Sequence, residues 1–322
     1  MPSPIDTLLL LALPASGKSE LRRYLASVDT EVAARDFGLG PTVQLDDYPY
    51  VHLMRRFSEE MQRIGESPAF FASDQDPFLD GYDWATLIEL VNEDYAALGT
   101  APSVPSEPTA WMFERFDRAR RLVGLDSPFN GLSDEVVASL VALLDDEIAE
   151  YARERRVVLA SYEPGVSTVL IEFARGGPEG TRPPLPDPYG YGFSLRHLST
   201  DILHRAAALY VWVTPDESRR RNVDRTVPGI EGAASILHHG VPEAVMREDY
   251  GIDDFRWLLE RGGGGVIEID VGGATYTLPA AVFDNRIDHT SFLRADLSQW
   301  DPGQVEELHT ALTSSFAELR RL

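Results

Sequence analysis

The chain has 322 residues and is 43% hydrophobic, which is enough to build a large core in one elaborated α/β domain or in two smaller domains. Its formal net charge of -23 would repel phosphodiester backbones and anionic lipid surfaces, so composition argues against nucleic-acid and membrane partners. The absence of cysteine excludes disulfides, thiolate metal sites and a cysteine nucleophile, and we expect a cytoplasmic protein.

The first predicted strand, Thr7 to Leu13, is a continuous apolar run typical of a strand buried on both faces of a parallel sheet. Lys18 to Ser27 is predicted to be the helix that follows it. The connecting segment reads Ala12-Leu13-Pro14-Ala15-Ser16-Gly17-Lys18-Ser19. A loop in this position offers backbone N–H groups and the positive end of a helix dipole to an anion. The Gly-Lys-Ser end therefore predicts a P-loop that holds a polyphosphate, although Ala12 replaces the first glycine of that pattern.

Lysine occurs once in this chain, at Lys18, whereas the other 28 basic residues are arginine. A site that wraps an ammonium group in backbone amides does not accept the larger planar guanidinium, so this lone lysine supports the P-loop interpretation. We expect Lys18 to bridge the outer phosphates of ATP or GTP and the Ser19 hydroxyl to bind Mg²⁺. The residues expected to line the nucleotide from this loop are Ala12, Pro14, Ala15, Ser16, Gly17, Lys18, Ser19 and Glu20.

A second short strand, Thr42 to Leu45, ends at two acids, Asp46 and Asp47, and precedes the predicted helix Val51 to Ile64. Open α/β sheets bind their ligands at the carboxyl ends of the strands. A carboxylate there can accept a proton from an attacking hydroxyl or hold Mg²⁺ through water. The alternative is that the two acids cap the following helix.

Residues 65–156 interrupt the alternation of strands and helices. The segment contains Pro-rich punctuation at Ala101 to Pro108 and a predicted helix over Val136 to Tyr151. We interpret it as a helical insertion in a P-loop nucleotide-binding core made of residues 1–64 and 157–322. The insertion either forms a cap that binds the phosphoryl acceptor or only adds packing.

The third predicted strand, Thr168 to Phe173, carries a single charge, Glu172. A carboxylate in a buried strand needs a partner, which is either a metal-bound water beside Ser19 or an arginine. A predicted helix, Leu195 to Arg205, then leads to a fourth strand, Ala208 to Val213. This alternation favours an α/β fold with a doubly wound parallel sheet.

Four arginines, Arg219, Arg220, Arg221 and Arg225, follow the fourth strand within seven residues. They predict a lid that stabilises charge on a migrating phosphoryl group, or else a solvated helix with internal ion pairs. Further along we expect a helix over Pro242 to Glu260, a hairpin of Val266 to Asp270 with Thr275 to Leu278, and a last helix over Pro302 to Leu322. Asn285, in the loop after the hairpin, is a candidate contact to the nucleotide base, and the alternative is that this loop is an ordinary turn after a strand.

The order of these segments resembles the P-loop small-molecule kinases, and most closely the uridine kinase and phosphoribulokinase branch. The segments that carry the resemblance are Ala12 to Ser19, Leu45-Asp46-Asp47-Tyr48-Pro49-Tyr50, Leu170-Ile171-Glu172-Phe173 and Asp216 to Arg225. The resemblance implies a sheet of the P-loop NTPase type, Asp46 as general base, Ser19 and Glu172 around Mg²⁺, and lid arginines on the phosphates. Asp46 is a further candidate ligand of this Mg²⁺, through water, from its own place at the strand end.

These observations together predict a kinase that transfers the terminal phosphoryl group of ATP or GTP to a hydroxyl of a small molecule such as a nucleoside or sugar-like metabolite. Two alternatives remain open from the sequence. One is a nucleotide-dependent switch protein without a small-molecule acceptor, and the other is a kinase that acts on a macromolecule. The acceptor and the oligomeric state are left open.

Overall fold

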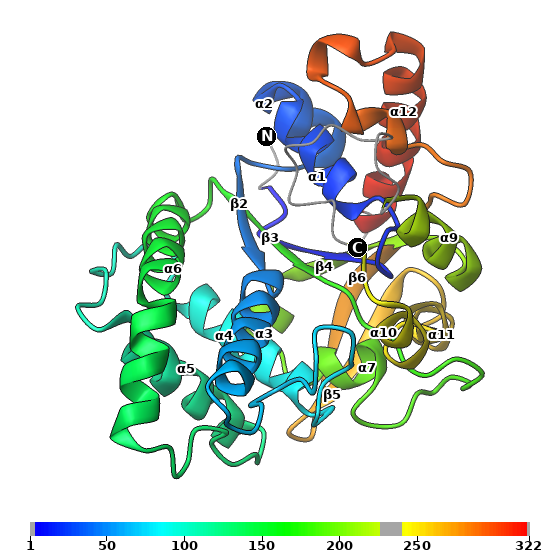
Figure 1. Cartoon of the computed structure of the whole chain (residues 1–322). Coiled ribbons are helices and arrows are strands. Elements are labelled where there is room, and N and C mark those ends of the chain that lie inside the picture. Colours follow the sequence, from blue (N-terminus) through cyan, green and yellow to red (C-terminus); the bar gives the residue numbers. More distant parts are fainter. Residues whose placement is uncertain (1–3, 226–239, 321–322) are drawn as a thin grey trace.

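The computed structural model describes residues 4–225 and 240–320, and its centre is a six-stranded sheet in the order β2-β3-β1-β4-β6-β5 (Figure 1). The strands are β1 (Thr7–Leu11), β2 (Thr42–Asp46), β3 (Thr168–Phe173), β4 (Ala206–Trp212), β5 (Val266–Val271) and β6 (Ala274–Asp284). Neighbouring strands from β2 to β6 run parallel, whereas the edge strand β5 runs antiparallel to β6. The predicted α/β class is confirmed. The sheet is mostly parallel, and its antiparallel edge strand β5 belongs to the hairpin that the sequence predicted.

The strand β6 extends the predicted hairpin into the main sheet. Its first half pairs with β5, and its second half, from Ala280 to Asp284, pairs in parallel with β4. The hairpin pattern predicted the turn at Gly272-Gly273 but ended the second strand at Leu278. The apolar residues that continue it are buried between helices on both faces, as expected of an internal strand.

Alternate side chains of the strands face two separate cores, because successive strand residues point to opposite faces of a sheet. Leu8 and Leu10 pack on the face covered by α1 (Lys18–Ser27), the π-helical turn η1 (Ala33–Phe37) and α12 (Pro302–Leu319). Leu9 and Leu11 pack on the opposite face. The elements over that face are α7 (Gly190–Leu195), α8 (Thr200–Leu203), α11 (Phe255–Arg261) and parts of α4 (Asp83–Ala96) and α6 (Asp134–Ala160).

A helical bundle with its own core stands beside the sheet, on the left of Figure 1. It consists of α3 (Tyr48–Arg63), α4, α5 (Pro108–Leu122) and α6. The helix α3 packs into this bundle through Leu53, Met54 and Phe57. In the sequence analysis, residues 1–64 were assigned to the core that contains the sheet. The helices α4 and α6 contribute to both cores and so fix the bundle to the sheet.

Two predicted helices are divided in the structure. Pro242 to Glu260 forms α10 (Glu243–Glu248) and α11, separated by a loop that ends with Asp254 before Phe255. Leu195 to Arg205 spans the end of α7 and all of α8, with a break before Ser199, whose hydroxyl caps α8. The arginine-rich segment forms α9 (Pro215–Arg225). The short elements α2 (Thr30–Val32), η3 (Ser291–Arg294) and η4 (Leu297–Gln299) complete the part of the chain that is described. No helix within that part is long and apolar enough to cross a bilayer.

Candidate functional site

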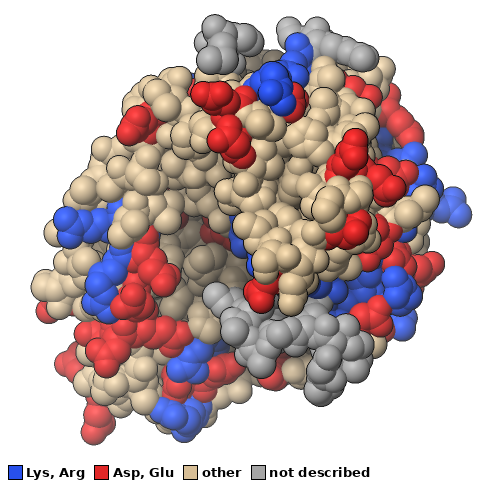
Figure 2. All heavy atoms as spheres, turned by 90° about the horizontal axis from the view of Figure 1, so that it is seen from above, with Lys and Arg blue, Asp and Glu red and all other residues tan. Residues whose placement is uncertain are grey.

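The loop after β1 lies at a point where the chain leaves neighbouring strands toward opposite faces of the sheet. After β1 the chain enters α1 on one face, and after its neighbour β3 it next forms α7 on the other face. Such a switch point leaves a crevice at the carboxyl ends of the strands, where open α/β sheets bind ligands. The molecule is hollowed on one side, near the bundle, and acidic and basic side chains lie within this hollow (Figure 2).

The backbone of the loop has the features that an anion requires. Gly17 adopts φ 99° and ψ 11°, and an added Cβ there would lie 2.4 Å from the Thr290 hydroxyl oxygen, so glycine is required at this position. The N–H groups of Gly17, Lys18 and Ser19 have no acceptor among the residues described. The buried hydroxyl of Ser16 also lacks a partner among them. Phosphate oxygens would satisfy these donors, so the loop fits a polyphosphate.

The Lys18 side chain, at the start of α1, reaches toward the end of β3. Its Nζ lies 3.8 Å from Glu172 Oε1. Burial lowers the pKa of Lys18, and the nearby carboxylates of Glu172 and Asp46 act against this shift. The lysine and the strand-end glutamate therefore lie side by side at the carboxyl end of β3.

Asp46 joins this site because it is the Cα partner of Glu172 in the parallel register between β2 and β3. Its carboxylate accepts a hydrogen bond from the backbone N–H of Tyr48, at 2.8 Å. Burial raises the pKa of Asp46 to about 7, and the negative charges of Glu172 and Asp47 add to the shift. A carboxylate with a pKa near neutrality is suited to accept and release a proton.

Arg22, one turn after Lys18 on α1, was not singled out from the sequence. Its Nη1 donates to Glu172 Oε2 at 3.1 Å and lies 3.8 Å from Asp46 Oδ2. The arginine predicted as an alternative partner of Glu172 is thus present together with the lysine. Its signal in the sequence was the spacing of four residues from Lys18, which places both side chains on one face of the helix.

Asp47 belongs to a different group of side chains. Its Oδ2 accepts a hydrogen bond from Arg175 Nη1 at 2.7 Å, and both side chains are buried. Arg175 also donates to the Ser194 hydroxyl and lies against the ring of Trp84. Because Asp47 is held by Arg175 at 2.7 Å whereas Asp46 lies beside Glu172 and only 3.8 Å from Arg22, Asp46 is the better candidate base of the two. Sequence analysis missed Arg175, whose only signal was an arginine two residues beyond a buried strand.

The four arginines of α9 lie in different surroundings. Arg220 is exposed and pairs with Glu217 and Asp224 on its own helix. Arg221 is buried and donates to the carbonyl oxygen of Asn285 at 2.8 Å. Ion pairing within the helix, the alternative reading of this segment, is thus present for Arg220, for Arg221 with Glu217, and for Arg219 with Asp216.

Arg219 and Arg225 differ from the other two because each keeps a buried guanidinium nitrogen without an acceptor in the described part of the chain. Arg219 pairs with Asp216 and Glu179. Arg225 reaches across to α1, where its Nη2 lies 3.2 Å from Glu20 Oε1. These two arginines retain hydrogen-bonding capacity for a phosphate.

Two residues expected to touch the nucleotide are placed behind the loop or beside it. Glu20 is buried, and its carboxylate holds both Arg225 and Arg294; these two guanidinium groups keep the pKa of Glu20 below its ordinary value although burial acts in the opposite direction. Asn285 is fully buried and donates to the carbonyl oxygen of Ser16 at 2.8 Å. Both side chains support the site through contacts within the protein.

Of the predicted metal ligands, Asp46 and Glu172 are Cα partners on β2 and β3, and Ser19 directly follows Lys18, whose Nζ lies 3.8 Å from Glu172. No group of three or more His, Cys, Asp or Glu side chains suited to a metal is found in residues 4–225 and 240–320. Mg²⁺ commonly binds through one or two carboxylates with phosphates and water, so this pair fits Mg²⁺ that arrives with a nucleotide. The adjacent histidines His238 and His239, which the sequence does not favour as metal ligands because no spaced carboxylate completes a set, lie outside the described residues.

Comparison with protein-family models, with curated proteins and with solved structures gives no match to this chain.

Proposed function

We propose that the protein is a P-loop kinase that transfers the terminal phosphoryl group of ATP or GTP to a hydroxyl group of a small molecule. One observation carries the proposal. Lys18, Glu172 and Asp46 converge at the carboxyl ends of adjacent parallel strands, directly behind a loop whose N–H groups lack acceptors among the described residues. Nucleotide phosphates, Mg²⁺ and an acceptor hydroxyl together require this combination of charges.

Each residue has a role that follows from its surroundings. Lys18 would hold the outer phosphates, and Ser19 and Glu172 would hold Mg²⁺, with Asp46 reaching it only through water. Asp46 also accepts the proton of the attacking hydroxyl, because its pKa lies near neutrality. When bound, Mg²⁺-nucleotide supplies the phosphoryl group and part of the charge neutralisation. Arg225 and Arg219 retain donors for the phosphate oxygens.

The strand order supports this assignment. The loop strand β1 lies inside the sheet between β3 and β4, so the nucleotide site is flanked by strand ends on both sides. The bundle beside β2 stands next to Asp46, since α3 begins at Tyr48. A bundle in this place is suited to close over an acceptor, which supports a cap role for residues 65–156.

The proposal is tested by incubating the full chain with Mg²⁺-ATP or Mg²⁺-GTP and a pooled mixture of polar metabolites, followed by mass spectrometry. Wild-type protein should produce a new phosphorylated species, and Lys18→Ala should not. Asp46→Asn should bind nucleotide but lose at least about a hundredfold in turnover, the contribution expected of a general base.

Asp47→Asn is the matched control because it changes the neighbouring acid, which is paired with Arg175. It should keep most of the turnover per folded molecule. Normal turnover by Asp46→Asn would contradict the role of Asp46 as base. Lys18-dependent nucleotide binding without any phosphorylated product would favour a nucleotide-dependent switch over a small-molecule kinase.

A further inference from the structure

Three carbonyl groups of the loop after β1 accept hydrogen bonds from side chains in three other parts of the chain. The carbonyl oxygen of Ala12 accepts from the Tyr191 hydroxyl at 3.0 Å, on α7. The carbonyl oxygen of Pro14 accepts from the Ser218 hydroxyl at 2.7 Å, on α9. The carbonyl oxygen of Ser16 accepts from Asn285 Nδ2 at 2.8 Å, after β6. All three donors are fully buried.

The regular alternation of these contacts has a direct effect on the backbone. In a trans peptide, the carbonyl of one residue and the N–H of the next point in opposite directions. Because every second carbonyl is held on the outside, the N–H groups of Leu13, Ala15 and Gly17 are turned toward the inside of the loop. Donors fixed in this way need no reorganisation when an anion binds.

Asn285 has the largest number of contacts among the three donors. Its Nδ2 also donates to the Thr290 hydroxyl at 2.9 Å, and its Oδ1 accepts from the backbone N–H of His289 at 2.8 Å. These bonds use both polar atoms of the side chain, so its orientation is fixed. The same Thr290 hydroxyl borders the space that a Cβ at Gly17 would fill.

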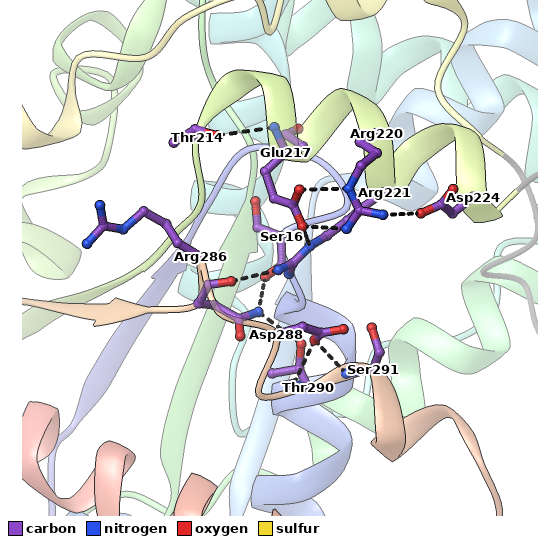
Figure 3. A network of polar contacts seen from close by, with 12 residues as sticks. Ser16, Thr214, Glu217, Arg220, Arg221, Asp224, Arg286, Asp288, Thr290 and Ser291 are labelled. Atoms are coloured by element: carbon purple, nitrogen blue, oxygen red, sulfur yellow. Dashed lines mark hydrogen bonds and ion pairs between the residues drawn. The ribbon is translucent and has the colours of Figure 1, made fainter.

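The helix α9 is tied to this arrangement through Arg221. Arg221 crosses from α9 to the segment after β6, close to Ser16 and Thr290 (Figure 3). Its Nη2 donates to the main-chain carbonyl of Asn285 at 2.8 Å, and its Nε is held by Glu217 at 2.6 Å. These contacts hold α9 in a fixed position against the loop after β1.

We propose that Asn285, together with Ser218 and Tyr191, acts as a positioning residue that sets the direction of the loop N–H groups and thereby the affinity for nucleotide phosphates. This inference rests on the proposed function. It differs from the expectation that Asn285 contacts the base, since the side chain is buried behind Ser16.

The decisive substitution is Asn285→Asp, which keeps the shape of the side chain. It replaces the donor Nδ2 with an oxygen that faces the Ser16 carbonyl oxygen and the Thr290 hydroxyl. Two oxygens that both accept repel one another, so the peptide between Ser16 and Gly17 should rotate and the N–H of Gly17 should turn away.

Asn92→Asp is a matched control because Asn92 has the same bonding pattern elsewhere. Its Nδ2 donates to a backbone carbonyl, of His197, and to a side-chain oxygen, of Glu89, while its Oδ1 accepts from the N–H of Ser199. Both variants should lose thermal stability. A positioning role predicts that only the variant at Asn285 also loses nucleotide affinity.

The measurement is isothermal titration of the full chain with Mg²⁺-ADP and, in parallel, Mg²⁺-GDP. The dissociation constant should rise at least about tenfold for Asn285→Asp and stay within about twofold of wild type for Asn92→Asp. A dissociation constant unchanged by Asn285→Asp would overturn the inference. If wild type shows no binding that depends on Lys18, the proposed function fails first, and the inference with it.

If Asn285→Asp does not fold, two less disruptive substitutions test the positioning role. Ser218→Ala removes one hydroxyl from the Pro14 carbonyl, whereas Ser315→Ala removes a buried hydroxyl from the Val282 carbonyl. The first should weaken Mg²⁺-ADP binding about three- to tenfold, and Ser218→Thr should restore it. Equal binding by both alanine variants would contradict the positioning role.

Discussion

Asp46 and Glu172 lie opposite one another on β2 and β3, and the guanidinium group of Arg22 lies between their carboxylates. The parallel register places both acids at the same level of the sheet, so their negative charges reinforce one another. Arg22 and Lys18 supply two positive charges from α1. The strand ends therefore form a compact charged site whose protonation depends on pH near neutrality.

The first prediction concerns the pH dependence of the proposed phosphoryl transfer. The base must be ionised, and burial raises the pKa of Asp46 to about 7. The value of kcat/KM should therefore rise with pH and level off at or below about pH 7, because Mg²⁺ beside Asp46 favours the ionised carboxylate. A pH profile of wild-type kcat/KM, measured with saturating Mg²⁺, would contradict the assignment if kcat/KM fell as the pH rose from about 5 to about 7.

The raised pKa of Asp46 should also make the free energy of unfolding depend on pH. The pKa of Asp46 is about 7 in the folded chain, whereas the ordinary value of an aspartate, expected in the unfolded chain, is 3.8. Between pH 3.8 and about 7 the folded state therefore binds more protons than the unfolded state. The free energy of unfolding contributed by this group therefore falls as pH rises through about 7. Asp46→Asn should be more stable than wild type at pH 8 by up to about 4 kcal/mol, and the gain should vanish near pH 4. Urea unfolding at the two pH values measures the difference.

A second prediction separates two arginines on α9. Arg225 is held beside Glu20, which directly follows Ser19, and it keeps a buried nitrogen without an acceptor among the described residues. Arg220 is exposed and pairs only within its helix. We expect Arg225→Gln to lower turnover at least about tenfold, because it removes charge stabilisation near the phosphates. Arg220→Gln should change turnover less than about twofold, since exposed pairs contribute about 0–1 kcal/mol.

Steady-state kinetics of the two glutamine variants, corrected for the folded fraction, tests this difference. Equal losses would mean that the arginines act together through the general positive charge of α9. A larger loss for Arg220→Gln would contradict the assignment of Arg225.

A third prediction addresses the bundle. Arg115 is fully buried on α5 and donates to Glu93, to Asp94 and to the Tyr50 hydroxyl. Arg115→Met should lower the free energy of unfolding by about 3 kcal/mol or more, because it leaves buried negative charge without its main partner. Arg118→Met, which removes an exposed partner of the same Glu93, should cost less than about 1 kcal/mol. Denaturant unfolding compares them; similar costs would show that the buried network tolerates the loss.

Local patterns predicted much of this molecule because they reflect short-range physical chemistry. Apolar runs such as Thr168 to Phe173 predicted buried strands, and the Gly-Lys-Ser turn predicted the loop and the start of α1. Helix boundaries were less accurate where side chains distant in sequence decide them. The break after α7 is one case, because Asn92 on α4 donates to the carbonyl oxygen of His197 and accepts from the N–H of Ser199.

The sequence by itself determined that a positively charged loop faces acidic strand ends. Each strand, the acid at its end and the helix that follows are neighbours in the sequence, so local patterns reveal them. The tertiary structure alone decided which of the two acids lies beside Glu172 and which is held by Arg175, 128 positions from Asp47. It also decided that Asn285 supports the Ser16 carbonyl across 269 positions. Partners so distant leave no periodic signal, and only the packing of the whole chain brings them together.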